Sequence, residues 1–133
     1  MKKYILILLI LSCVSCEKYS HTKMYEYRVK NNFATQTVKI IPTSASDFWV
    51  ISNEEFIVVS GEEIIIGSKI TYNDDKKAKD IYSSEDIIIP FELYVDDVKQ
   101  EIDFAKRKFW TFSQGTVNES GRYTLMIDEK SLK

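Results

Sequence analysis

Histidine, cysteine, proline and glycine are all scarce in this chain. Its 133 residues include one His, two Cys, two Pro and four Gly. The single histidine, His21, cannot supply a body that follows it with a Ser-His-Asp site, a Cys-His site or a His-bearing zinc site. Low Gly and Pro contents exclude collagen-like and low-complexity classes. We therefore expect no catalytic residues, no bound metal and no cofactor.

The chain also has almost no excess of charge of either sign. Eighteen Lys and Arg residues against 20 Asp and Glu residues give a formal net charge of −2. No basic field is present to attract nucleic acid, and we expect no nucleic-acid partner. Apolar residues make up 44% and charged residues 29% of the chain. This balance and the length are typical of a single globular domain.

Both cysteines lie near the N-terminus, behind a short apolar run. Lys2 and Lys3 precede the run Tyr4–Leu11 (YILILLIL), and polar residues begin at Glu17. The run falls well short of the ~20 residues that a membrane-spanning helix needs. A basic start, a short apolar segment and small residues at its end are typical of a secretory signal, which we expect to be helical.

The end of this segment resembles a bacterial lipoprotein signal, in which small or aliphatic residues precede a cysteine that receives lipid. Val14-Ser15-Cys16 fits this pattern, and Cys13 is the alternative site. The resemblance implies a signal peptide at 1–15, a tether at 16–23 and a folded domain at 24–133. It implies anchoring to a membrane of the bacterial cell envelope through the N-terminal lipid, and we expect the outer membrane. A secretory signal without lipid is the remaining alternative.

Removal of residues 1–15 would change the length and the net charge of the mature chain. It leaves 118 residues, and loss of Lys2 and Lys3 lowers Lys plus Arg from 18 to 16 against 20 acidic residues, a net charge of −4. With Cys16 acylated, no thiol would remain in the fold. The exported domain would then depend on its hydrophobic core alone, without a disulfide.

The body alternates apolar and polar residues with the period of a β-strand. Tyr25, Tyr27 and Val29 alternate with charged residues, and turn-forming residues follow at short intervals. Strands are predicted at Tyr25–Val29, Thr35–Ile41, Phe48–Ile51, Phe56–Val59, Glu63–Ile66 continuing through Ile70–Tyr72, Ile87–Val95, Val98–Ile102, Lys108–Ser113 and Arg122–Ile127. About eight short strands in succession predict an all-β fold, an antiparallel β-sandwich.

The segments between these strands are predicted as turns and loops. Ser60-Gly61-Glu62 is expected to be a hairpin loop, and Asp96-Asp97 a tight turn. Gly67 is expected to bend its strand. The stretch at 73–86 is the most polar of the body, and we expect an exposed loop with one helical turn near 76–80. The tail at 128–133 is expected to form a short turn.

The segment at 25–61 resembles the opening of small immunoglobulin-like or transthyretin-like β-sandwich lipoproteins. The resemblance rests on the strand pattern Tyr27-x-Val29-x-Asn31-Asn32 and on the turn Gly61-Glu62. It implies an immunoglobulin-like sandwich and carries no activity with it.

Five side chains are candidates for binding. Trp49 and Trp110 could stack on sugar rings, although tryptophans in strands this apolar are more often core residues. Lys106, Arg107 and Lys108 form a basic run beside an aromatic pair, which could favour anionic groups but is more often an exposed turn.

Two alternatives rest on carboxylates. A two-carboxylate glycosidase site would have to be assembled from different strands, because adjacent residues of one strand point to opposite faces. Asn73, Asp74, Asp75 and Asp80 could offer oxygens to an irregular Ca²⁺ site, although their spacing does not match an EF-hand.

The sequence therefore predicts a non-enzymatic lipoprotein of the cell envelope, a binding or accessory module for a protein or glycan partner. The alternative is an inhibitor or immunity protein directed against an exported hydrolase or toxin.

Overall fold

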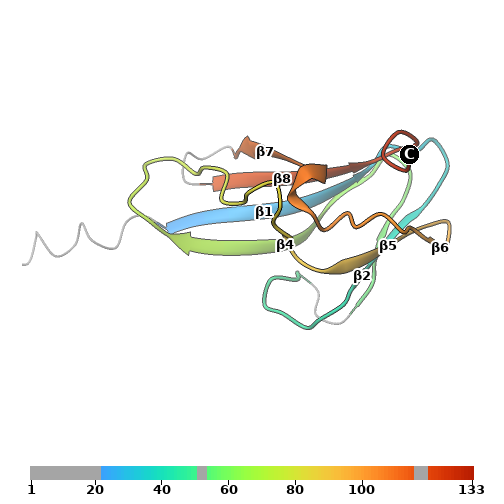
Figure 1. Cartoon of the computed structure of the whole chain (residues 1–133), viewed down its shortest axis with the longest axis horizontal. Helices are drawn as coiled ribbons and strands as arrows, with labels where there is room; N and C mark the ends of the chain where they lie inside the picture. The colour runs from blue at the N-terminus through green and yellow to red at the C-terminus, as the bar shows by residue number, and fades with distance from the viewer. Residues whose placement is uncertain (1–21, 51–53, 116–119) are drawn as a thin grey trace, which may run out of the picture.

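The computed structural model describes residues 22–50, 54–115 and 120–133. The predicted signal helix, Cys13, Cys16 and His21 lie outside these ranges. The described chain is all-β, with eight strands in two sheets around one core (Figure 1). The strands are β1 (Thr22–Asn31), β2 (Val38–Pro42), β3 (Phe56–Val58), β4 (Glu63–Tyr72), β5 (Phe91–Val95), β6 (Val98–Lys99), β7 (Trp110–Gln114) and β8 (Ser120–Ile127), with a 3₁₀ turn, η2, at Arg107–Phe109.

The strand order is β4-β1-β8-β7 in the first sheet and β3-β2-β5-β6 in the second. Neighbouring strands are antiparallel except β1 and β8, which run parallel. The predicted sandwich is confirmed, but the expectation of antiparallel strands is wrong for this pair. A parallel pair requires a long crossover connection, and here the whole of the intervening chain supplies it.

The alternation that predicted the first strand is realised as one buried and one outward face. Tyr25, Tyr27 and Val29 are fully buried, whereas the residues between them point outward. Tyr123 on β8 is fully buried beside them. The aromatic core of the first sheet is thus built from its two central strands.

A β-bulge interrupts the pairing of β1 with β4. Tyr27 pairs with Gly67 and Arg28 pairs with Ile65, so Ile66 is an extra residue on β4. The bend predicted at Gly67 is therefore confirmed as a shift of register at this glycine.

Asn31 joins the two sheets at the end of β1. Its side chain is fully buried, and its Nδ2 donates to the carbonyl oxygens of Gln36 (2.7 Å) and of Val58 on β3 (2.8 Å). Its Oδ1 accepts a hydrogen bond from the Phe33 N–H at 3.0 Å. Both donors and the acceptor of this amide are therefore satisfied without water.

The hairpin predicted at Ser60–Glu62 is wrong. Gly61 does adopt a positive φ of 80°, as a turn requires, but β3 and β4 belong to different sheets. The segment is a crossover between sheets. The turn at Asp96-Asp97 is confirmed: both residues have positive φ and join β5 to β6.

Other predicted strands are shorter than expected or absent. The part of Phe48–Ile51 that the structure describes forms one isolated bridge, from Trp49 to Gly67, and Ile51 lies outside the described residues. The strand predicted from Ile87 begins only at Phe91. Residues 76–80 form no helical turn. Asp128 closes the predicted C-terminal turn, since its backbone oxygen accepts the Ser131 N–H at 3.2 Å.

Candidate ligand-binding groove

The connection from β4 to β5 folds back over the buried face of the first sheet instead of projecting into solvent (Figure 1). Tyr25 on β1 donates its hydroxyl proton to the carbonyl oxygen of Lys79 at 2.9 Å. The hydroxyl of Tyr123 on β8 accepts the Ile81 N–H at 2.8 Å. Two buried tyrosines therefore bind the backbone of this connection, at Lys79 and at Ile81. Most residues at 73–86 are exposed, as expected for this loop, but the segment also covers the core, with Ala78 only 1% exposed.

Asp80 links this connection to β8 and to the 3₁₀ turn η2. Its carboxylate accepts the Tyr123 hydroxyl at 2.7 Å and the Arg107 Nε–H at 3.1 and 3.2 Å, and Arg107 Nη2 also donates to it. Burial opposes ionisation, but the hydrogen bonds from Arg107 and Tyr123 outweigh it and lower the pKa of Asp80 below its ordinary value. Asp80 and Arg107 therefore remain an ion pair at neutral pH.

Tyr82 stands at the surface end of the tyrosine cluster. Its hydroxyl shares a hydrogen bond of 2.8 Å with the hydroxyl of Tyr27, and its ring meets the Tyr123 ring edge to face at 5.2 Å. Burial raises the pKa values of Tyr27 and Tyr123, so both hydroxyls stay protonated. The hydroxyl of Tyr27 and the ring of Tyr123 position the Tyr82 ring. Because the Tyr27 and Tyr123 hydroxyls stay protonated, they are not suited to act as general bases.

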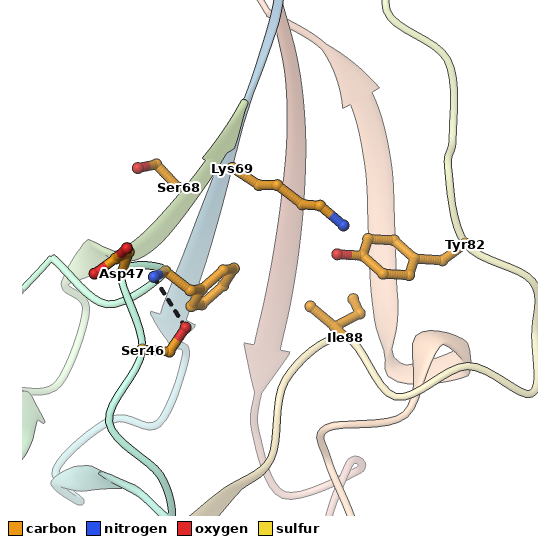
Figure 2. Close-up of a pocket in the computed structure, with 7 residues that line it drawn as sticks. Ser46, Asp47, Ser68, Lys69, Tyr82 and Ile88 are labelled. Carbon is orange, nitrogen blue, oxygen red and sulfur yellow. Dashed lines mark hydrogen bonds between the residues drawn. The ribbon is translucent and has the colours of Figure 1, made fainter. Parts of the chain in front are cut away.

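A groove of about 370 Å³ opens on one side of Tyr82 (Figure 2). Its walls come from the segment after β2, from β4 and from the connection after β4. The lining residues are Ser46, Asp47, Phe48, Ser68, Lys69, Tyr82 and Ile88. The groove therefore combines two aromatic rings and an aliphatic side chain with two hydroxyls, one cation and one anion.

Lys69 is a charged group beside the Tyr82 ring. Its side chain points across the groove toward Tyr82 in Figure 2, and Nζ lies 5.5 Å from the centroid of that ring. Among the residues that the structure describes, no carboxylate forms an ion pair with it. The ammonium group is thus oriented by a cation–π contact and still has hydrogen-bond donors to offer.

Gly67 permits the opposite wall to form. A Cβ at this position would lie 2.2 Å from Cε1 of Phe48, a distance that two carbon atoms do not reach. Phe48 occupies that space, and its ring contacts Tyr27 edge to face with centroids 4.5 Å apart. The segment is held to β4 by Ser68 N–H, which donates to the Phe48 carbonyl at 2.9 Å.

Tyr82 also lines a second hollow, of about 250 Å³. Asp80, Ser84, Arg107 and Lys108 complete its lining. Tyr82 therefore shares one hollow with Lys69 and another with Arg107 and Lys108, and Asp80 neutralises the charge of Arg107.

The structure corrects the candidate role of the tryptophans. Trp49 is 4% exposed and Trp110 is 3% exposed, and both indoles belong to the core. Their Nε1–H groups donate to the carbonyl oxygens of Ser44 (3.0 Å) and Phe104 (2.8 Å). Neither ring has a free face for a sugar, because both rings pack between other aromatic side chains.

The basic run is divided by the 3₁₀ turn. Lys106 and Lys108 are exposed, whereas Arg107 turns inward to Asp80. Sequence reasoning placed Arg107 and Lys108 among the candidates but missed Lys69 and Tyr82. The local pattern gave no signal for Lys69, because it alternates with the apolar Ile70 and Tyr72 and would be placed on the polar face of its strand.

The loop considered for Ca²⁺ uses its carboxylates internally. Asp75 pairs with Lys79 at 2.9 Å, and Asp80 pairs with Arg107. Within the three described ranges, no group of three or more His, Cys, Asp and Glu side chains could hold a metal ion. A further hollow of about 330 Å³ on the second sheet is lined by Lys39 and Asp97, which pair at 2.8 Å.

Comparison with known proteins adds no relative. No protein-family model, no curated protein and no solved structure matches this chain. Among the described residues, no helix is both long and apolar enough to cross a membrane.

Proposed function

We propose that this chain is a lipoprotein of the bacterial cell envelope whose immunoglobulin-like sandwich binds an anionic glycan in the groove beside Tyr82. The observation that carries the proposal is the pairing of the half-buried aromatic rings of Phe48 and Tyr82 with the Lys69 ammonium group across an open groove. Sugar rings offer apolar C–H faces to aromatic rings, and a carboxylate or phosphate on the sugar would accept from Lys69.

Several features support a binding role without catalysis. The titratable groups that line the groove are Lys69, the exposed Asp47 and Tyr82, whose hydroxyl is hydrogen-bonded to that of Tyr27. The side chains around it are held by a rigid sheet and by buried hydrogen bonds, which suits a preformed binding surface. Ser46 also lines the groove with a short polar side chain, whereas the Ser68 side chain points away from Lys69 and Tyr82 in Figure 2.

The anchor is supported by the sequence pattern ending at Cys16. Acylation there, with removal of residues 1–15, would place the domain in the envelope, in our proposal at the outer membrane. Metabolic labelling with a fatty-acid probe tests this step. Label should be incorporated by the natural chain and lost in Cys16→Ser, while label lost only in Cys13→Ser would move the anchor to that residue.

Binding is tested by titration of the mature chain with acidic oligosaccharides on an array and in solution. Lys69→Gln removes one charge-assisted hydrogen bond, worth about 1.5–3 kcal/mol, and should weaken binding at least tenfold. Lys77→Gln is the matched control, because Lys77 is exposed in the connection after β4 and does not line the groove. Equal affinities in the two variants would refute the groove as the site.

The alternative function, inhibition of an exported hydrolase or toxin, predicts a different outcome. No acidic glycan would bind, and the mature chain would capture one enzyme from an envelope extract and block its activity. That result would replace the glycan proposal.

A further inference from the structure

An exposed apolar patch lies on the outer face of the first sheet, at the end where the chain enters β1. The patch consists of Met24, Ile70 and Tyr72, whose exposed fractions are 49%, 56% and 81%. Met24 is the cross-strand partner of Ile70, and Thr22 is the partner of Tyr72. Directly opposed side chains of an antiparallel pair contact each other, so the three residues form one surface.

The outer face changes character farther along the same strand. Glu26, Arg28 and Lys30 occupy the next outward positions of β1, and Glu26 pairs with Arg28 at 2.9 Å. Ile65 and Met126 are also partly exposed, but they stand opposite Arg28 and Lys30. An apolar surface without charged cross-strand partners is therefore confined to the end of the sheet at which β1 begins.

That end is also the one nearest the proposed anchor. Six residue steps separate Cys16 from Thr22, which allows at most about 20 Å of fully extended chain. Figure 1 shows the chain entering β1 at the same end as the loop that follows β4, far from the C-terminus. This loop carries the exposed Lys76 and Lys77 directly after the patch.

We infer that Met24, Ile70 and Tyr72 rest in the interface of the lipid bilayer that holds the anchor. The inference depends on the proposed lipid at Cys16. Tyrosine favours the level of the lipid headgroups, with its ring among apolar chains and its hydroxyl toward water. A short tether and an apolar patch beside it would then fix the orientation of the domain, with the C-terminal end pointing away from the membrane.

Fluorescent probes on single cysteines test this orientation. The mature acylated chain has no free thiol, so Tyr72→Cys and Val98→Cys can each carry one bimane label. Val98 is the control because it is 64% exposed and lies on β6, at the opposite end of the domain in Figure 1. The chains are reconstituted in vesicles of phosphatidylethanolamine and phosphatidylglycerol, some with nitroxide-bearing acyl chains.

We expect a blue-shifted emission and strong nitroxide quenching at position 72, and neither at position 98. Water-like emission at both positions on vesicles that carry the chain would overturn the inference while leaving the anchor intact. A blue shift at position 72 without nitroxide quenching would also overturn it, because a second copy of the chain would then cover the patch.

A chain without lipid at Cys16 gives a different result, because it would not migrate with the vesicles in a flotation gradient. The Tyr72→Cys and Val98→Cys variants are then combined with Cys16→Ser, so that each chain has one thiol to label, and are held on nickel-chelating lipids by a histidine tag before residue 16. Quenching at position 72 but not at 98 would uphold membrane contact by the patch, and its absence would refute that contact.

Discussion

Replacement of Asn31 by aspartate isolates the contribution of one buried amide to the sandwich. Asn31→Asp keeps the size and shape of the side chain but converts its two N–H donors into an oxygen. That oxygen would face the carbonyl oxygens of Gln36 and Val58 from the positions now separated by 2.7 and 2.8 Å. Asn31 and Val58 are fully buried, so water cannot replace the donor to the Val58 carbonyl, whereas the bond to Gln36 is only partly buried.

The cost follows from these contacts. Two net hydrogen-bond contributions of about 1 kcal/mol each are lost, and two carbonyl groups lose a partner at about 1–3 kcal/mol each where they stay dry. Partial relaxation reduces the sum, and we expect a loss of roughly 3–5 kcal/mol in the free energy of unfolding. At a urea dependence of about 2 kcal/mol per molar, the midpoint falls by roughly 2 M.

The loss depends on pH in a defined direction. The two carbonyl oxygens and burial disfavour the charged form, so the folded-state pKa of the new carboxyl rises above its unfolded value of about 3.9. An acid with a raised folded pKa destabilises the protein above that range and less below it. The gap between the variant and the natural chain should therefore be largest at pH 7 and narrow as the pH falls toward 4.

Urea unfolding followed by circular dichroism at pH 7 and pH 4 measures this gap. Asn32→Asp is the matched control, because it makes the same chemical change at the next residue, whose side chain is exposed. It should change the free energy of unfolding by less than about 0.5 kcal/mol. Equal effects of the two substitutions, or a gap at position 31 that widens on acidification, would refute the reasoning.

Three further predictions concern glycine positions and the ion pair. Gly67→Ala should displace Phe48 and cost about 1–3 kcal/mol, measured by urea unfolding, with a parallel loss of glycan affinity at the groove. Gly61→Ala has open space around it but a φ of 80°, so about 1–2 kcal/mol should be lost while the groove keeps its affinity. In the natural chain, the lowered pKa of Asp80 stabilises the fold above the unfolded-state pKa, and this contribution is lost as the pH falls through the folded-state pKa. In Asp80→Asn, the free energy of unfolding should therefore fall less steeply on acidification. An unchanged acid limb in that variant would mean that the pair with Arg107 contributes nothing.

Local pattern predicted the elements whose side chains alternate. Tyr25, Tyr27 and Val29 alternate with charges, and the strand that they predicted is present, as is the final strand at 120–127. Gly61 predicted its own turn correctly, but a positive φ specifies only the local chain reversal. Which sheet the next strand joins depends on contacts between residues far apart in sequence, and for this reason the hairpin prediction failed.

The groove could not be predicted from the sequence, for a different reason. The connection after β4 is rich in charged side chains, which predicted a solvated loop. Its backbone, however, is bound by the hydroxyls of Tyr25 and Tyr123, two residues whose pattern indicated only burial. Hydrogen bonds from core tyrosines to a distant backbone leave no periodic signal, so the positions of Tyr82 and Lys69 at one groove emerge only from the three-dimensional structure.

The parallel pairing of β1 with β8 has a mechanical consequence. The chain enters β1 at one end of the molecule and leaves β8 at the other, and eight cross-strand residue pairs join these two strands side by side. A pulling force between a fixed N-terminal end and a load at the C-terminal end acts along both strands in opposite directions. All of their shared hydrogen bonds are then sheared together instead of being opened one after another, so tension along this axis meets the whole ladder at once.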